Sequence, residues 1–259
     1  GVEAIGAFRS DAGTEDATPY KIVEATDKKV VFEGFTTDGL GIRKTYAISE
    51  GEGSDEHLLQ FNLVLTNNGK EPLKAAQRWI YTGTAEAHNP ADPAVPPSYF
   101  SNDSGNILIQ PHLKLTDEDG WFSKASPVYN ASFEALRYSG VMSRFYATIL
   151  STKEGVDQPG KLWATRFKLN HTGDQWEGQK GATSDYAVQA SMGLPLLDLS
   201  PAASISYDLE LYTGPKEFHR LHKLGRQRDF VMDYGWFLWP VKYVLINLLR
   251  WFHDLLGSW

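Results

Sequence analysis

The sequence predicts a mainly β protein, a large antiparallel β-sandwich followed by C-terminal α-helices. Strand-length apolar runs, bounded by clusters of Gly, Asn or Asp, follow one another from residue 29 to residue 214. Strands and helices do not alternate along this stretch, which argues against a parallel sheet and for an antiparallel sandwich. After Pro215 the apolar spacing changes to that of helices.

The strand-length runs are rich in β-branched and aromatic residues. Phe61, Leu63 and Leu65 fall on alternate positions, which predicts a strand buried on one face only. The tetrapeptide 67–70 (NNGK) predicts a hairpin turn, because Asn-Gly tolerates the positive φ of a tight turn. The expected strands are KVVFEGFT (29–36), IRKTYAIS (42–49), LLQFNLVLTN (58–67), LKAAQRWIY (73–81), ILIQPHLKL (107–115), GVMSRFYATIL (140–150), LWATRFKL (162–169), DYAVQASM (185–192) and SISYDLELYTG (204–214).

Three regions are expected along the chain. Residues 1–28 are small, polar and turn-rich, and are expected to form a poorly ordered lead-in or partial strands. Residues 29–214 form the sandwich domain, in which 86–105, with four prolines, is a long exposed loop. Residues 215–259 form a helical linker that ends in an amphipathic helix.

The last two dozen residues are the most apolar and Trp-rich part of the chain. With Pro240 in the first turn, one arc of about 140° collects the polar and small residues of this helix. That arc contains Lys242, Asn247, Arg250, His253, Asp254 and Gly257. The opposite side contains Val241, Val244, Leu245, Leu248, Leu249, Trp251, Phe252, Leu255, Leu256 and Trp259.

Such a helix suits a position in the membrane interface. Charges interrupt it too often for a bilayer span, which takes about 20 mostly apolar residues. Tryptophans and cations on an amphipathic helix are typical of interfacial helices. The residues expected at the interface are Trp236, Trp239, Leu248, Trp251, Phe252, Leu255 and Trp259. The alternative is a C-terminal helix packed on a soluble core.

Composition limits the classes of partner. The net charge is −7, and Lys and Arg are not concentrated in any stretch, which argues against nucleic acid. The chain has no cysteine, so disulfides and thiol chemistry are excluded. It contains no signal peptide or spanning segment and begins at Gly1, so it is expected to be a fragment of a longer protein.

The motifs predict no catalytic, cofactor or metal site. His219 and His222 stand at i, i+3, but a zinc site needs three or four ligands and no third residue has a supporting spacing. His88, His112 and His171 could join carboxylates in a sugar-processing site, because His/Glu pairs perform general acid–base catalysis, but no such pair has a distinctive context. The chain also lacks the GxSxG, P-loop and GxGxxG motifs.

Three passages resemble the large periplasmic domain of the YidC membrane-protein insertase family. They are KTYAIS followed by LLQFNLVLTNNGKEPLKAA, then SGVMSRFYATIL, and finally LYTGPKEFHRL leading into MDYGWFLWPVKYVLINLLRWFHDLLGSW. The third is the most specific, and together they cover most of the chain from about residue 29. The family's usual opening strands are not visible before Lys29, and the loop at 90–97 has only loose counterparts.

The resemblance implies a β-supersandwich of the galactose-mutarotase-like type closed by C-terminal helices. It also implies a non-catalytic periplasmic domain, on the periplasmic face of the bacterial inner membrane, of a multi-pass insertase and chaperone. The implied partners are the membrane surface, nascent membrane proteins and accessory subunits of the Sec translocon. The alternative function is a secreted sugar-binding or mutarotase-like protein of the same fold.

Overall fold

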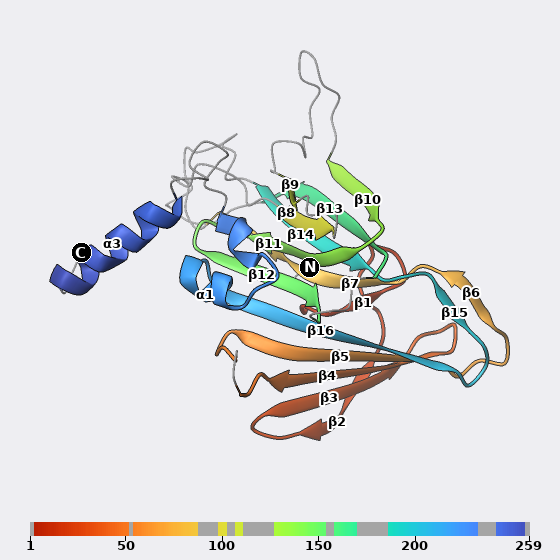
Figure 1. The fold of residues 1–259 in the computed structure, drawn as a ribbon. Coiled ribbons are helices and arrows are strands. Elements are labelled where there is room, and N and C mark those ends of the chain that lie inside the picture. Colours follow the sequence, from red (N-terminus) through yellow and green to blue (C-terminus); the bar gives the residue numbers. More distant parts are fainter. Residues whose placement is uncertain are drawn as a thin grey trace, which may run out of the picture.

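The computed structural model describes residues 3–51, 54–87, 98–102, 107–110, 127–153, 158–169, 186–232 and 242–256. Two large sheets and one small sheet dominate this part of the chain, and every strand pair in them is antiparallel. This confirms the predicted class, a mainly β antiparallel sandwich followed by C-terminal helices (Figure 1).

The nine-stranded sheet has the order β2-β3-β4-β5-β16-β12-β11-β8-β9. Its strands are β2 (Tyr20–Ala25), β3 (Lys29–Phe35), β4 (Leu40–Ile48), β5 (Leu58–Asn67), β8 (Ser98–Asn102), β9 (Ile107–Gln110), β11 (Leu136–Met142), β12 (Tyr146–Thr152) and β16 (Ser204–Pro215). The predicted alternation holds in β5, where Phe61, Leu63 and Leu65 are buried while the residues between them are half-buried.

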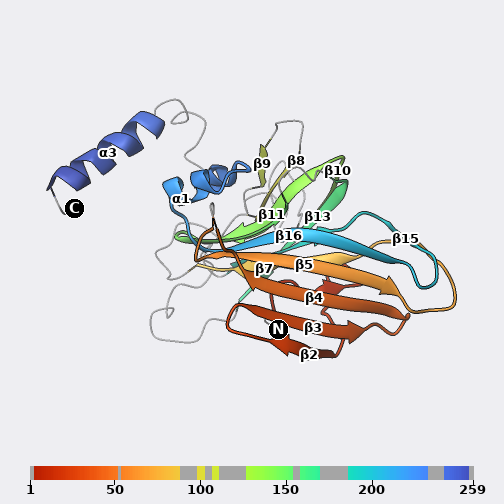
Figure 2. The same cartoon turned by 60° about the horizontal axis from the view of Figure 1, so that its bottom comes forward.

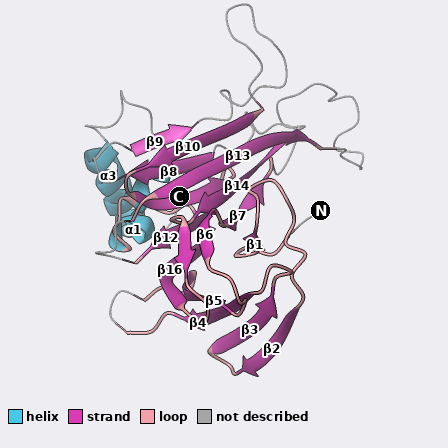
Figure 3. Ribbon diagram, turned by 90° about the vertical axis from the view of Figure 1, so that its right-hand side faces the viewer, coloured by secondary structure: helices cyan, strands magenta, loops and turns pink. Residues whose placement is uncertain are grey.

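The five-stranded sheet has the order β1-β7-β14-β13-β10, and β15 pairs with β6 in a separate ribbon. These strands are β1 (Phe8–Arg9), β6 (Leu73–Ala76), β7 (Trp79–Ala85), β10 (Val128–Phe133), β13 (Gly160–Lys168), β14 (Tyr186–Gly193) and β15 (Leu197–Leu199). In Figure 3, β2 and β3 lie in one layer while β13, β14 and β7 lie in the other.

One hydrophobic core joins the two large sheets. Phe8, Ile80 and Leu162 come from the five-stranded sheet and pack in the same cluster as Leu63 and Leu209 of the nine-stranded sheet. The opposite face of the nine-stranded sheet carries a second cluster, which includes residues of the C-terminal helices. The nine-stranded sheet is therefore covered on both faces over part of its area.

The described helices all follow the strands. They are α1 (Phe218–Lys223), the short 3-10 helix η4 (Arg228–Met232) and α3 (Lys242–Leu256). The predicted change to helical spacing after Pro215 is thus confirmed. Figure 1 shows α1 beside β12 and β16, whereas α3 stands clear of the sheets in Figures 1 and 2.

Two expected strands are each two strands in the structure. The segment 73–81 divides into β6 and β7, which belong to different sheets. The segment 140–150 is a hairpin rather than one strand, because Ser143 turns the chain. The Ser143 amide donates to the Tyr146 carbonyl at 2.8 Å, and the Tyr146 amide donates to the Ser143 hydroxyl at 3.2 Å.

The predicted hairpin at 67–70 is also wrong. A turn is present, but β5 pairs with β4 and β16 rather than with β6, and Gly69 has no positive φ. The Asn67 side chain holds this turn instead, since its amide donates to the carbonyls of Glu71 and Leu199, both at 2.9 Å. The turn at 67–70 is therefore stabilised by hydrogen bonds of the Asn67 side chain, and not by the positive φ that the Asn-Gly pair predicted.

Strands also occur in residues 1–28 and in the expected loop 86–105. Of the two alternatives for 1–28, partial strands are found, because β1 and β2 precede Lys29. The side chain of Phe8 in β1 is buried in the shared core. The strand β8 lies inside the expected loop 86–105, whose residues 88–97 and 103–105 fall outside the described ranges.

Candidate membrane-docking segment and N-terminal cavity

The C-terminal segment is packed on the sandwich before it reaches α3. Leu221 of α1 and Val231 beside it in η4 are fully buried against Tyr138, Ile149 and Tyr212 of the nine-stranded sheet. The helical spacing after Pro215 explains this contact, because it places Phe218 and Leu221 on one side of α1. The segment α1–η4 is therefore part of the folded sandwich.

Arg228 anchors η4 to the sheet. Its side chain is 1% exposed, and its guanidinium donates to the Ser151 hydroxyl at 2.6 Å. The same group forms an ion pair with Glu210 of β16 and donates to the Leu224 carbonyl. A buried cation is tolerated when a carboxylate and further acceptors surround it, as they do here.

A second arginine fixes α1 to the connection between β4 and β5. Nη1 of Arg220 lies 2.9 Å and 3.0 Å from the two carboxylate oxygens of Asp55, which is an ion pair with two contacts. Nη2 of Arg220 lies 3.2 Å from Glu56. Arg220 thus ties α1 to the β4–β5 connection, while Arg228 ties η4 to β12 and β16 of the same sheet.

Gly225, Arg226 and Gln227, between α1 and η4, all have positive φ, at 66°, 54° and 60°. Glycine adopts this conformation freely, but the other two residues do so at an energetic cost. Surrounding contacts hold them there. Arg226 donates to the Thr152 hydroxyl at 2.7 Å, and the Tyr138 hydroxyl donates to the Gln227 carbonyl at 3.3 Å.

Helix α3 presents large apolar side chains to solvent. Leu248 is 45% exposed, Trp251 56%, Phe252 42% and Leu255 63%. The rings of Trp251 and Phe252 contact each other edge to face, with their centroids 5.0 Å apart. The expected helix is present as α3, and these four of the seven expected interface residues lie on it. The other three, Trp236, Trp239 and Trp259, lie outside the described residues.

The described part of α3 is shorter than a bilayer span. At 1.5 Å per residue, its 15 residues extend about 22 Å, less than the roughly 30 Å of a hydrocarbon core. Across the described ranges, no helix combines the length and apolarity of a membrane span.

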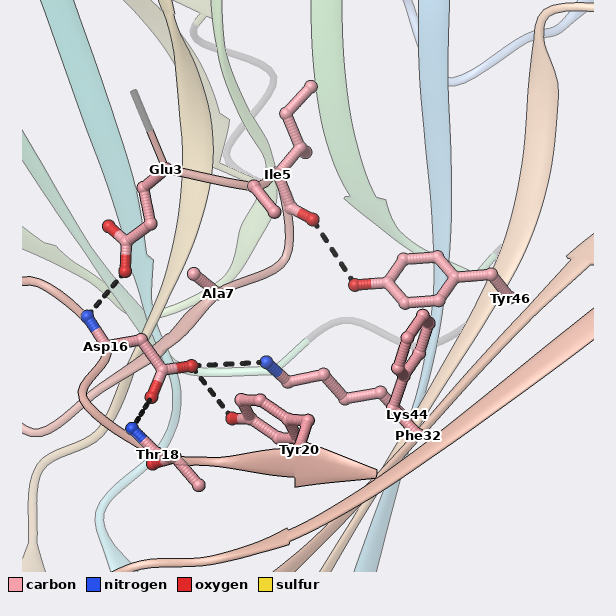
Figure 4. A pocket seen from close by; sticks show the side chains of 10 residues that line it. Glu3, Ile5, Ala7, Asp16, Thr18, Tyr20, Phe32, Lys44 and Tyr46 are labelled. Atoms are coloured by element: carbon pink, nitrogen blue, oxygen red, sulfur yellow. Dashed lines mark hydrogen bonds and ion pairs between the residues drawn. The ribbon is translucent and has the colours of Figure 1, made fainter. Parts of the chain in front are cut away.

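A cavity of about 300 Å³ lies between the N-terminal segment and the nine-stranded sheet (Figure 4). Its walls are mainly apolar and come from Ile5 and Ala7 on one side and from Phe32 and Tyr46 on the other. Lys44 of β4 lies between these walls, on the inward side of its strand. The cavity exists because residues 3–20 fold over β2, β3 and β4.

Lys44 is 5% exposed and has few partners. Its Nζ lies 3.4 Å from Oδ2 of Asp16 and 4.0 Å from the centre of the Tyr20 ring. Burial lowers the pKa of Lys44 to about 8, although the Asp16 charge opposes this shift. The ammonium is therefore incompletely compensated, because 3.4 Å is long for a hydrogen bond.

The Asp16 carboxylate has more hydrogen-bond partners than the Lys44 ammonium. Its Oδ2 accepts hydrogen bonds from the Phe8 amide and the Tyr20 hydroxyl, both at 2.8 Å, and its Oδ1 accepts one from the Thr18 amide at 3.0 Å. Burial acts to raise the pKa of Asp16, but the Lys44 charge and these donors hold it below its usual value. Burial and the Asp16 charge in turn raise the pKa of Tyr20.

The sequence did not single out this cavity. One signal was present, since Lys44 alternates with Leu40 and Ile42 and so falls on the buried face of β4. The partner Asp16 could not have been inferred, because it belongs to the stretch interpreted as a lead-in.

Of the histidines singled out in the sequence, His219 and His222 of α1 lie in the part of the chain that the structure describes. His88, His112 and His171 lie outside the described residues. His222 stacks on Phe218 and lies 3.4 Å from Asp229. In the described part of the chain, no three residues of the types His, Cys, Asp and Glu are grouped to hold a metal ion. Another cavity, of about 420 Å³, is lined by His57 and Glu86 among others.

Comparisons with known proteins point to one family. The family model described as the YidC periplasmic domain matches residues 9–248. The membrane protein insertase YidC of Bordetella avium is 27% identical, over 90% of this chain and 37% of the relative. That of Pelobacter propionicus is 22% identical, over 94% of this chain and 39% of the relative. The chain thus spans about two fifths of the length of these curated relatives.

Among solved structures, two that are similar to this chain have low sequence identity and TM-scores below 0.5. A putative aldose 1-epimerase from Escherichia coli K12 is 14% identical with a TM-score of 0.43, over 76% of this chain and 68% of that chain. A galactose mutarotase-like protein from Lactobacillus casei is 11% identical with a TM-score of 0.43, over 82% of this chain and 83% of that chain.

Proposed function

We propose a function on the premise that this chain belongs to the family of YidC periplasmic domains: it is a non-catalytic module that assists the insertion and folding of inner-membrane proteins. It acts on the periplasmic face of the inner membrane, alone or with the Sec translocon. In this proposal the sandwich domain consists of the expected residues 29–214 together with β1 and β2, and residues 215–259 link it to the membrane surface.

The observation that carries the proposal is the exposure of the apolar residues of α3. Leu248, Trp251, Phe252 and Leu255 would remain in water unless another apolar phase covered them. Exposed apolar patches of this kind mark contact with membranes or partners. A helix lying in the interface buries such a face while its polar arc stays with the headgroups.

The anchoring of α1–η4 supports the same role. Arg220 and Arg228 hold this segment on the nine-stranded sheet, and α3 begins ten residues after η4 ends. A membrane-bound α3 would therefore keep the sandwich close to the bilayer, within reach of segments that emerge from it. The nascent membrane proteins and the Sec accessory subunits expected as partners belong to this proposal.

The test is vesicle binding by a variant that carries Leu248→Ser, Trp251→Ser and Phe252→Ser. Burying each large apolar side chain is worth about 1.5–3 kcal/mol, so we expect affinity for liposomes to fall by about 100-fold or more. Cosedimentation and tryptophan fluorescence measure the binding, and circular dichroism checks that the sandwich stays folded.

A matched control replaces three exposed apolar residues of the sandwich, with the changes Ile22→Ser, Val23→Ser and Phe35→Ser. This variant should bind vesicles as the unmodified protein does. Equal loss in both variants, or unchanged binding by the α3 variant, would contradict an interfacial α3. Unfolding of the sandwich by the α3 changes would instead identify the helix as a core element.

The alternative, a sugar-binding or mutarotase-like protein, has one supporting observation. The cavity beside His57 and Glu86 brings together the two residue types that serve in general acid–base chemistry. On our proposal, purified protein has no aldose epimerase or glycosidase turnover. Turnover that disappears in a His57→Ala or Glu86→Gln variant would favour the alternative.

A further inference from the structure

We propose that the cavity at Lys44 binds an uncharged apolar ligand that offers one hydrogen-bond-acceptor oxygen to the ammonium group. This site is separate from the membrane contact of α3, so the two can be tested independently. Two sources supply such chemistry, a small neutral molecule and an apolar residue of a peptide whose carbonyl is the acceptor.

The size and lining of the cavity suit an apolar group. Its volume of about 300 Å³ is at the lower end of the range for small-molecule sites. Figure 4 shows Ile5 and Ala7 above the cavity and the rings of Phe32, Tyr46 and Tyr20 around it. An apolar group placed among these side chains would leave water, which is favourable in proportion to the area buried.

The acceptor requirement follows from Lys44. Its three N–H donors have two partners, the Asp16 carboxylate at 3.4 Å and the face of the Tyr20 ring. A buried ammonium with unfilled donors is costly, and the low pKa of Lys44, about 8, reflects that cost. A ligand oxygen about 2.8 Å from Nζ would accept a hydrogen bond from the ammonium group and so replace part of the hydration that burial removes.

The charge requirement follows from the neighbouring ion pairs. Lys44 faces Asp16, and Glu3 at the rim of the cavity is paired with Arg9, so the two cations balance the two carboxylates. A ligand carboxylate would lie against Asp16, which stays ionised because its pKa is lowered. A ligand cation would meet Lys44. A neutral acceptor avoids both repulsions.

The experiment measures the acetylation rate of each lysine in the folded protein at pH 8 by mass spectrometry. N-acetylphenylalaninamide is the probe, because it has an apolar ring and neutral carbonyl oxygens. At saturation we expect the acetylation of Lys44 to slow at least 10-fold, since the amide covers Nζ and raises its pKa. Lys28, with its side chain 68% exposed, is the internal reference and should keep its rate.

Three matched probes test the chemistry. N-acetylphenylalanine carries a carboxylate, N,N,N-trimethylphenylalaninamide carries a permanent cation that cannot be acetylated, and ethylbenzene has no acceptor. Each should protect Lys44 at least several-fold less than the neutral amide at equal concentration. Equal protection by any of them, no protection by the amide, or equal slowing at Lys28 would overturn the proposal. The pentapeptide acetyl-Gly-Gly-Phe-Gly-Gly-amide separates the sources: protection by it supports a peptide residue, and protection by the small amide alone supports a free molecule.

A pair of variants on β4 gives a second readout. Lys44→Met removes the ammonium from the inward face, and Arg43→Met removes a cation from the outward face of the same strand. The amide should raise the unfolding temperature of the unmodified protein and of Arg43→Met, and this rise should be lost in Lys44→Met. A rise retained in Lys44→Met would overturn the proposal. If Lys44→Met does not fold, the acetylation experiment decides alone.

Discussion

Lys44 makes the stability of the sandwich depend on pH in a predictable direction. In the unfolded chain this amine keeps its proton up to about pH 10.5, whereas in the folded protein it does so only up to about pH 8. Between these values the unfolded state binds more protons, so the free energy of unfolding rises with pH. Above pH 10 the trend reverses, because Tyr20 and Tyr46 have raised pKa values and keep their protons in the folded state.

We therefore expect the free energy of unfolding to increase by about 2 kcal/mol between pH 8 and pH 10. Urea unfolding at pH 7.5, 8.5 and 9.5 measures this slope. The Lys44→Met variant should lack it, and Arg43→Met should retain it, because Arg43 is exposed on the other face. A slope that persists in Lys44→Met would assign the pH dependence to other groups.

At the scale of elements, the sequence predicted where strands form better than how they pair. The sequence predicted both ends of β5 and its buried face, because the alternation of apolar residues can be recognised within the segment itself. The pairing of β5 with β16, across more than 130 residues, left no local mark, and the Asn-Gly turn suggested a hairpin that does not form. Helix α3 was predicted from its period, whereas the anchoring of η4 depends on Ser151 and Glu210 from distant strands.

The anchor of η4 should be sensitive to the removal of Arg228. Changing Arg228→Met leaves Glu210 without its buried cation, and we expect the free energy of unfolding to fall by about 3–5 kcal/mol. Arg228→Lys keeps the charge but loses the planar group that spans several acceptors, so its loss should be smaller. Arg43→Met breaks an exposed ion pair and should cost less than about 1 kcal/mol.

Hydrogen exchange locates the effect of these changes. The amides of α1 and η4 should lose protection first in Arg228→Met, since Leu221 and Val231 depend on this docking for their burial. Unchanged protection there, together with a uniform loss in the sheets, would show that Arg228 stabilises the sheet itself and not the attached segment.

At the scale of the whole molecule, the N-terminal segment closes the sandwich. The strand β1 pairs with β7 of the five-stranded sheet, and β2 pairs with β3 of the nine-stranded sheet, so residues 8–25 connect both layers. The cavity at Lys44 results from this closure, which explains why the sequence did not predict it. A segment without long apolar runs was interpreted as a lead-in or partial strands. In the structure Phe8 is buried in the shared core, and Ile5 and Tyr20 pack against it.

The two sheets should therefore unfold as one cooperative unit. Changing Phe8→Ala removes a ring that is buried in the core shared by both sheets, and we expect the free energy of unfolding to fall by about 3–5 kcal/mol. Hydrogen exchange of the slowest amides in β5 and in β14 measures each sheet separately, and both should lose the same free energy. Phe35→Ala, at an exposed position, should change neither by more than about 0.5 kcal/mol. A loss confined to β14 and its neighbours would mean that the five-stranded sheet opens on its own and that the sandwich is two folding units.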